Sequence, residues 1–253
     1  MTERRGPRQW PYPRLAAHRG AGKLAPENTL AALKVGHALG YRMAEFDVKL
    51  SADGVAFLLH DATLQRTTNG WGRSDALSWR ELAQLDAGAW HSRPYAGEPL
   101  ATLGAVASFC SANGVAVNVE IKPTPGRERE TGAAVALDAS LFWSESTTPP
   151  LLSSFSELAL AAAQETVPDL PRAYLFNRLP VDWRERCMTL GCVAVDVKHS
   201  ALKPKIVEEA HALGLAVVTW TVNDPARANL LAQWGVDTII TDAVDRIRPE
   251  TQR

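Results

Sequence analysis

Eight short apolar segments, separated by stretches with the pattern of helices, are the feature of this sequence that most restricts its fold. Each segment has the length and composition of a buried strand. They cover residues 14–18, 43–50, 115–121, 151–154, 172–176, 192–197, 215–220 and 236–241. Repeated strand–helix units with short connections predict a parallel α/β sheet, and eight units predict that it closes into a barrel. A doubly wound open sheet is the alternative.

Helices are expected between these strands, at about residues 28–40, 102–114, 128–143, 156–165, 180–190, 203–213 and 225–233. In the first helix, Asn28 is a natural N-cap and Gly40 a natural end. A short last helix is expected after Asp242. Because the composition does not change along the chain, we predict one domain that spans residues 1–253.

Residues 51–99 do not follow the strand–helix alternation. They contain a hairpin-like piece and a turn at residues 67–72. We interpret this segment as a small insertion between the second strand and the second helix. Trp71, Trp79 and Trp90 are expected to form a small core of its own.

Charge and cysteine content exclude several classes of partner. The formal net charge of −1 gives no overall basic field, so neither nucleic acid nor stable membrane association is expected. Three cysteines without metal-type spacing indicate buried free thiols and a reducing setting. Residues 1–10 lack the apolar segment of a secretory signal, and no apolar run approaches the ~20 residues of a membrane helix. We expect a soluble cytoplasmic protein; its oligomeric state stays open.

Two carboxylates interrupt the second apolar segment. Glu45 and Asp47 are two residues apart, and the period of two in a strand places both on one face. Adjacent carboxylates inside a core repel each other and lose hydration, so they need a compensating cation. The next strand ends in His60 and Asp61, which brings a histidine close to this pair.

Other polar residues also stand at strand ends, where a barrel of this type has its active site. They have both signs of charge and include His18, Arg19, Glu120, Lys122, Ser153, Ser154 and Trp220. Glu120 and Lys122 are again two residues apart and share a face. We therefore expect these side chains to converge on one mouth of the barrel.

The residue types indicate chemistry at that mouth. Glu45, Asp47 and Glu120 offer only oxygen ligands, which suit Mg²⁺ or Ca²⁺ better than Zn²⁺. Cations at residues 19 and 122 fit a substrate that carries its own negative charge, most simply a phosphate. Histidines at positions 18 and 60 can act as general base and acid near neutral pH. Together these groups suit phosphoryl transfer to water or to an internal hydroxyl.

Each of these residues also has a structural interpretation. The carboxylates could pair with Arg19 and Lys122 in a buried ion-pair cluster that holds no metal, although burying so many charges costs free energy. Asp61 could be a cap or turn residue, and Trp220 could belong to the core or to the pocket wall. Asp196 and His199, near the end of the sixth strand, are weaker candidates for the pocket.

Taken together, the motifs resemble those of the glycerophosphodiester phosphodiesterase family, and most closely the cytosolic enzyme of the bacterial glycerol-phosphate uptake system. The resemblance extends over nearly the whole chain from about Tyr12. Its motifs are Ala17-His18-Arg19-Gly20, Pro26-Glu27-Asn28-Thr29, Glu45-Phe46-Asp47-Val48, Asp53-Gly54, His60-Asp61, Arg66-Thr67-Thr68-Asn69-Gly70, Glu120-Ile121-Lys122-Pro123, Trp220-Thr221-Val222-Asn223 and residues 235–242.

The resemblance implies a TIM barrel with a small insertion and one divalent cation, Mg²⁺ or Ca²⁺, held by Glu45, Asp47 and Glu120. It implies His18 and His60 as the acid–base pair. Substrate and phosphate contacts would come from Arg19, Lys122, Glu27, Asn28 and Trp220. The expected reaction hydrolyses glycerophosphodiesters, such as glycerophosphocholine, to sn-glycerol 3-phosphate and an alcohol.

Two other functions stay open at this point. One is a phosphodiesterase that acts on lysophospholipid, against which the lack of a basic amphipathic helix argues. The other is a non-catalytic barrel that binds a phosphate ligand, since a fold alone does not specify catalysis. The presence of both histidines and all three acids favours an enzyme.

Overall fold

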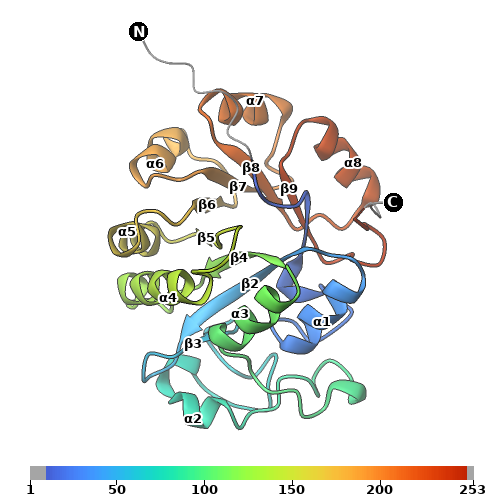
Figure 1. Ribbon diagram of the computed structural model, residues 1–253, viewed down its shortest axis with the longest axis vertical. Helices are drawn as coiled ribbons and strands as arrows, with labels where there is room; N and C mark the ends of the chain where they lie inside the picture. Colours follow the sequence, from blue (N-terminus) through green and yellow to red (C-terminus); the bar gives the residue numbers. More distant parts are fainter. Residues whose placement is uncertain (1–9, 250–253) are drawn as a thin grey trace.

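The computed structural model describes residues 10–249, and its strands close into a barrel (Figure 1). The parallel strands are β1 (Leu15–Ala17), β2 (Met43–Leu50), β4 (Ala116–Ile121), β5 (Leu151–Ser154), β6 (Arg172–Phe176), β7 (Ala194–Lys198), β8 (Ala216–Trp220) and β9 (Thr238–Thr241). β1 pairs with β9 on one side and with β2 on the other, which closes the ring. The predicted α/β barrel is confirmed, and the open sheet was the wrong alternative.

Helices follow seven of the eight barrel strands and surround the barrel in Figure 1. They are α1 (Leu30–Ala38), α3 (Leu103–Ala112), α4 (Glu128–Phe142), α5 (Glu157–Thr166), α6 (Trp183–Thr189), α7 (Pro204–Ala212) and α8 (Pro225–Gln233). The chain after β9 forms turns up to residue 249, so the short last helix is not found in the part that the structure describes.

The first helix begins one residue later than its sequence suggests. Thr29 is the N-cap of α1, and its Oγ1 accepts a hydrogen bond from the backbone N of Ala32 at 3.1 Å. The prediction of Asn28 as the cap was wrong. Asn28 has a φ of 59°, a left-handed conformation that asparagine tolerates, and its side chain turns toward Asp47 instead. A residue suited to a cap is therefore used inside the barrel mouth.

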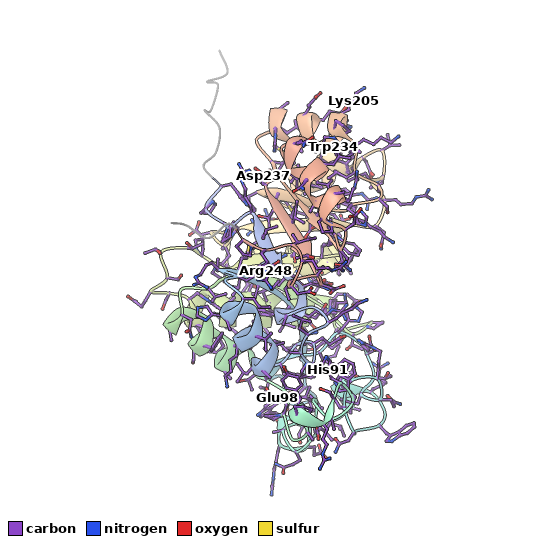
Figure 2. All side chains as sticks on the ribbon, turned by 90° about the vertical axis from the view of Figure 1, so that its right-hand side faces the viewer. His91, Glu98, Lys205, Trp234, Asp237 and Arg248 are labelled. Atoms are coloured by element: carbon purple, nitrogen blue, oxygen red, sulfur yellow. The ribbon has the colours of Figure 1, made fainter. Side chains whose placement is uncertain are left out.

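The segment between β2 and α3 forms a separate small layer at one end of the molecule (Figure 1). It contains β3 (Ala56–Leu58), which is antiparallel to β2, α2 (Trp79–Leu82) and three-residue 3₁₀ turns at Ser74–Ala76 and Arg93–Tyr95. Figure 2 labels His91 and Glu98 in this layer. The Glu98 carboxylate accepts a hydrogen bond from the backbone N of Ala31, which attaches the layer to the start of α1.

The expected tryptophan core of this layer is only partly present. Its buried residues are Phe57, Leu59, Leu64, Leu82, Ala87 and Leu100. Trp79 packs against them, but Trp71 is 81% exposed and Trp90 is 41% exposed. Gly70 lies directly against the side chains of Leu64 and Leu85. Leucines fill the space that the tryptophans were expected to fill.

The barrel interior is apolar at the amino ends of the strands and polar at their carboxyl ends. Apolar side chains from most strands of the ring fill the interior toward the amino ends of the strands. Among them are Ala16, Met43, Leu151, Ala173, Ala194, Val218 and Ile240. On β2 the inward positions then continue as Glu45, Asp47 and Lys49, all of them buried. A larger apolar core lies between the strands and the helices. On β2 the inward polar side chains therefore lie toward the carboxyl end of the strand.

Cys110, Cys187 and Cys192 are buried free thiols, as expected. Between residues 10 and 249, no helix is long and apolar enough to cross a bilayer. Residues 1–9, which carry most of the segment in which we expected no secretory signal, lie outside the described part of the chain.

Candidate active site

A cavity of about 260 Å³ opens at the carboxyl ends of the barrel strands. Its lining comes from nearly every strand of the ring, because parallel strands present their carboxyl ends at one rim. The lining residues are His18, Arg19, Glu45, His60, Asn118, Glu120, Lys122, Ser153, Phe155, Leu175, Asn177, Asp196, Trp220, Thr221 and Ile240. The structure therefore brings together most of the residues that the sequence nominated.

Three acidic side chains meet beside this cavity. Glu45 and Asp47 come from β2 and Glu120 from β4, and Asp47 is the direct register neighbour of Glu120. One carboxylate oxygen from each residue lies within 4.8 Å of the other two, and all three residues are buried. Burial raises the pKa of Glu45 well above its usual value, and the neighbouring carboxylates raise it further. Burial and the charge of Asp47 likewise raise the pKa of Glu120 to about 7.

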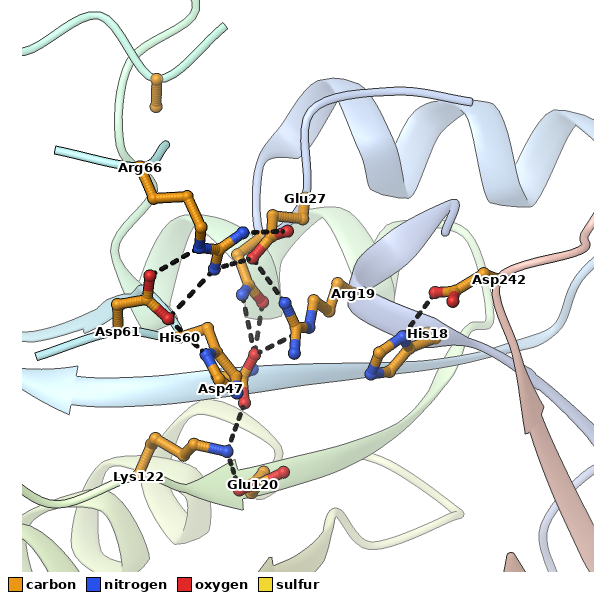
Figure 3. A network of polar contacts seen from close by, with 12 residues as sticks. His18, Arg19, Glu27, Asp47, His60, Asp61, Arg66, Glu120, Lys122 and Asp242 are labelled. Atoms are coloured by element: carbon orange, nitrogen blue, oxygen red, sulfur yellow. Dashed lines mark hydrogen bonds and ion pairs between the residues drawn. The ribbon is translucent and has the colours of Figure 1, made fainter. Parts of the chain in front are cut away.

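Two cations neutralise part of this negative charge (Figure 3). Lys122 Nζ lies 2.6 Å from Glu120 and 3.3 Å from Asp47, and Arg19 Nε lies 3.4 Å from Asp47. Burial alone would raise the pKa of Asp47, but these cations hold it below its usual range. An ion-pair cluster is therefore present, as the alternative interpretation expected.

Glu45 lies outside these ion pairs. Its carboxylate accepts a hydrogen bond from the backbone N of Arg19 at 3.2 Å and lies 3.8 Å from His18 Nε2. Within residues 10–249 it has no ion pair with a lysine or arginine. The three carboxylates converge, and one of them, Glu45, has no lysine or arginine partner. Such a group fits a hard divalent cation, which takes carboxylate oxygens as ligands. Glu45, Asp47 and Glu120 could hold a metal ion.

His18 stands where β1 ends and is held from behind (Figure 3). Its Nδ1 lies 2.6 Å from Asp242 Oδ1, and Asp242 also accepts a hydrogen bond from Asn223 Nδ2 at 3.0 Å. A carboxylate only accepts hydrogen bonds, so Nδ1 carries the proton and Nε2 is left for the cavity. Burial would raise the pKa of Asp242, but the bond with His18 lowers it to a net value below the usual one.

Local backbone geometry explains the His-Arg-Gly sequence at this point. Arg19 has a φ of 51° and Gly20 a φ of 97°, so the chain turns sharply after β1. A Cβ at Gly20 would lie 2.9 Å from both Ala32 Cβ and the backbone N of Leu33, so only glycine fits against α1. The tight turn places His18 and Arg19 on the cavity.

His60 reaches the cavity from the loop after β3. Its Nδ1 lies 2.6 Å from Asp61 Oδ1, and Asp61 accepts a second bond from Arg66 Nε at 2.5 Å. Burial lowers the pKa of His60, because it disfavours the charged imidazolium. The hydrogen bond from Arg66 lowers the pKa of Asp61 to about 2. His60 thus has the same arrangement as His18, with an aspartate on Nδ1 and Nε2 free.

Two of the expected substrate contacts lie behind the cavity rather than on it. Glu27 bridges Arg19 at 2.6 Å and Arg66 at 2.8 Å (Figure 3). Asn28 donates to Asp47 Oδ2 at 2.8 Å and accepts from the backbone N of Asp47 at 3.0 Å. Both residues are engaged with site residues and do not line the cavity. In this structure they support the arginine and the acid, and their contact with a substrate stays a prediction.

Of the remaining predicted site residues, some line the opposite wall of the cavity and others do not. Ser153 lines the cavity, but Ser154 points out of the barrel and donates to Ile121 O at 2.7 Å, so Ser154 was wrongly expected at the mouth. Consecutive strand residues face opposite sides, which accounts for the difference. Trp220 lines the cavity and packs edge to face on Phe155. Asp196 also lines it, whereas His199 does not.

Several functional candidates were missed at the sequence level. Asn118 and Lys49 could have been found, because each lies two residues from a nominated acid on the same strand. Lys49 Nζ donates to Lys122 O at 3.0 Å, and burial lowers its pKa to about 8. Asp242 lies 224 residues from its partner His18, so no local pattern could pair them.

Comparisons with known proteins agree with this geometry. The model of the glycerophosphoryl diester phosphodiesterase family matches residues 18–246. The glycerophosphodiester phosphodiesterase of Caldanaerobacter subterraneus subsp. tengcongensis is 31% identical over 230 residues, which cover 89% of this chain and 92% of that protein.

Solved structures are similar over the same range. A phosphodiesterase from Oleispira antarctica, determined in complex with the product sn-glycerol-3-phosphate, matches with a TM-score of 0.88 at 35% identity and covers 93% of this chain and 95% of that one. A glycerophosphodiester phosphodiesterase from Agrobacterium tumefaciens matches with a TM-score of 0.78 at 27% identity, over 92% and 98% of the two chains. The likeness extends over more than nine tenths of this chain.

Proposed function

The chain belongs to the glycerophosphoryl diester phosphodiesterase family, and from that membership we propose that it hydrolyses glycerophosphodiesters such as glycerophosphocholine and glycerophosphoethanolamine. The products would be sn-glycerol 3-phosphate and the free alcohol. As a glycerophosphodiester phosphodiesterase it is a hydrolase. The choice of these particular substrates is our proposal.

One observation supports the proposal most strongly: two histidines, each held by an aspartate through Nδ1, face the same cavity as an acidic cluster and two cations. Acid–base catalysis needs two groups that exchange protons near neutral pH, and imidazole does so. Phosphodiester hydrolysis also needs positive charge near the phosphoryl oxygens. Arg19 and Lys122 supply such charge from the chain itself.

We assign His18 and His60 as the acid–base pair. One Nε2 would accept a proton from the nucleophile, which is water or the glycerol 2-hydroxyl; attack by the hydroxyl would give a cyclic phosphate that water then opens to sn-glycerol 3-phosphate. The other histidine would begin protonated on both nitrogens and would donate its Nε2 proton to the leaving alkoxide. Asp242 and Asp61 would fix the tautomer and orientation of the two rings. Arg19 and Lys122 would bind the phosphate and hold its phosphorus between the two imidazoles.

Glu45, Asp47 and Glu120 would hold one divalent cation, Mg²⁺ or Ca²⁺. When bound, it supplies Lewis-acid charge that stabilises negative charge on the phosphoryl group. Because burial and mutual repulsion raise the pKa of Glu45, a bound cation would also relieve an unfavourable charge in the protein itself.

We place this activity in the cytoplasm, in the supply of glycerol phosphate, with a small-molecule substrate and no nucleic-acid partner. The near-neutral composition supports this placement, since it gives no basic surface for a polyanion. Buried free thiols are in keeping with a reducing compartment.

The test measures sn-glycerol 3-phosphate released from glycerophosphocholine, first with EDTA and then with Mg²⁺ or Ca²⁺ added back. We expect release only with a divalent cation. His18→Ala and His60→Ala should each lower turnover by about 10²–10⁴-fold, and the double variant should be little worse than either one. His211→Ala is the matched control, because His211 also pairs with an aspartate, Asp237, but outside the cavity.

Two results would contradict the proposal. Release that persists in EDTA would remove the metal from the reaction. Turnover near wild type in both histidine variants would remove the acid–base pair. Equal activity on lysophospholipid micelles would instead indicate a lipid substrate for the same site.

A further inference from the structure

Unpartnered polar atoms gather on this one cavity. Nine buried side-chain nitrogen and oxygen atoms between residues 10 and 249 have no hydrogen-bond partner within the protein. Seven of the nine belong to cavity residues: Arg19, Asn118, Ser153, Asp196 and Trp220. Buried polar groups are normally hydrogen-bonded, so such a concentration calls for an explanation.

Three of these residues form a group that the proposed mechanism does not use. Asn118 on β4, Ser153 on β5 and Asp196 on β7 are 1%, 0% and 0% exposed. Asn118 is the register neighbour of Glu45, and Ser153 of Glu120, so both lie against the acidic cluster. We call Asn118, Ser153 and Asp196 the floor, since Phe155, at 37% exposure, lies nearer the mouth.

The floor is costly for the protein alone. An unpaired buried polar group costs about 1–3 kcal/mol, and both oxygens of Asp196 and both polar atoms of the Asn118 amide are unpaired. Strand neighbours such as Ser154 show that this sequence readily pairs a buried hydroxyl when it serves only the fold. Groups that are kept unpaired at a cavity are free for a ligand.

The chemistry of the floor suits hydroxyl groups. Burial raises the pKa of Asp196 well above its usual value, and the charge of Glu120 raises it further. A carboxyl accepts a hydrogen bond from a hydroxyl group in either protonation state, and an amide and a hydroxyl each offer both a donor and an acceptor. A phosphate would need donors and cations, which Arg19 and Lys122 provide elsewhere in the cavity. An alcohol hydroxyl is itself both donor and acceptor and matches all three groups.

We propose that Asn118, Ser153 and Asp196 bind the hydroxyl groups of the glycerol arm and so orient the diester, with glycerol toward the floor and the other alcohol toward Phe155 and Trp220. This inference rests on the proposed function, because it names which part of the substrate each end of the cavity takes. The polar floor would bind the glycerol arm, which all substrates of this class share. The end of the cavity near Phe155 and Trp220 would leave room for the alcohol, which differs between substrates.

The test compares substrates with and without a polyol arm. Turnover of glycerophosphocholine and of bis(4-nitrophenyl) phosphate is measured for the wild type, Asp196→Leu, Ser153→Ala and Asp196→Asn. Asp196→Leu and Ser153→Ala should lower kcat/KM for glycerophosphocholine about tenfold, the usual effect of one lost hydrogen bond, and leave the nitrophenyl ester within twofold. Asp196→Asn keeps a donor and an acceptor. It should therefore retain most of the preference for glycerophosphocholine over the nitrophenyl ester.

A binding measurement makes the result independent of turnover. Calorimetry with Mg²⁺ present compares sn-glycerol 3-phosphate with inorganic phosphate. Asp196→Leu and Ser153→Ala should weaken only the glycerol ester, by about tenfold. The matched control is Ser154→Ala, which removes an equally buried hydroxyl from the outer face of the same strand and should leave the preference unchanged.

The outcomes separate the two proposals. If the wild-type protein cleaves only the nitrophenyl ester, glycerophosphodiesters are not its substrates. The binding comparison would still show whether the floor binds the glycerol hydroxyl groups. An unchanged preference in both floor variants would overturn the inference. A change in the ratio between choline and ethanolamine esters, with glycerol binding intact, would overturn it by placing the other alcohol at the floor.

Discussion

The buried polar groups of the cavity fall into two regions that differ in their hydrogen-bond and ion-pair partners. At the charged side of the cavity, most of the charged groups pair with one another: Arg19 pairs with Glu27, Lys122 with Glu120, and each histidine with an aspartate. At the floor, Asn118, Ser153 and Asp196 have no partners within the protein. Strand β4 contributes to both regions, with Glu120 on the charged side and Asn118 in the floor.

The difference indicates what each region is built to do. Paired charges hold reactive groups at fixed distances before any ligand arrives, which favours catalysis through preorganisation. The unpaired floor groups hold no other residue in place, and they gain hydrogen bonds only when a ligand enters. Glu45 belongs to the charged side but forms no ion pair with a lysine or arginine. Like the floor residues, it would therefore gain a partner only from a bound ligand, here a cation.

The largest effect is expected at Glu45. Glu45→Gln keeps the shape but removes the uncompensated charge, and we expect kcat/KM to fall by about 10³-fold together with weaker cation binding. Calorimetric titration with Mg²⁺ and Ca²⁺ checks the binding, and turnover at saturating cation checks the rate. Glu157→Gln, outside the cavity, is the control. Normal cation affinity in Glu45→Gln would show that the charged side is complete without a metal.

A smaller effect is expected at Asp242, which acts through His18. Asp242→Asn removes the carboxylate that fixes the ring, and we expect kcat to fall about 10–100-fold with little change in KM. The pH profile of kcat should also change, which a purely structural loss would not cause. Asp237→Asn breaks the matched surface pair with His211 and should leave the profile as it is. An unchanged profile for Asp242→Asn would separate Asp242 from catalysis.

The contrast between paired and unpaired groups also predicts stability. Ser154→Ala breaks the bond to Ile121 O and should lower the free energy of unfolding by about 1 kcal/mol. Ser153→Ala removes an unpartnered hydroxyl and should leave that free energy unchanged or raise it slightly. Urea unfolding of the two variants measures both. Equal losses would mean that Ser153 has a partner in the folded protein.

The smallest effect concerns acid stability at the charged side. The folded-state pKa of Asp61 is about 2, below its unfolded value of about 3.9, so its contribution is present above pH ~4 and lost as pH falls toward 2. Since the group is partly exposed, the contribution is about 1 kcal/mol at most. The stability difference between wild type and Asp61→Asn should therefore shrink from pH 5 to pH 2 in urea unfolding. A constant difference would contradict the pairing.

Much of this protein was determined by local sequence patterns. The strands lie within two residues of their predicted bounds, because length and apolar content specify a buried strand locally. The period of two correctly placed Glu45 with Asp47, and Glu120 with Lys122, on inward faces. It would have predicted Asn118 as well. These properties depend on residues close together in the chain.

Only the tertiary structure decided which of these groups meet. Asp242 reaches His18 because β9 pairs with β1 when the ring closes, and nothing near either residue encodes that contact. Thr29 replaced Asn28 as the cap because Asp47 engages the asparagine side chain. The floor is also a tertiary result. Asn118, Ser153 and Asp196 lie unpaired because three separate strands end at one cavity, and such long-range register is set by packing of the whole barrel.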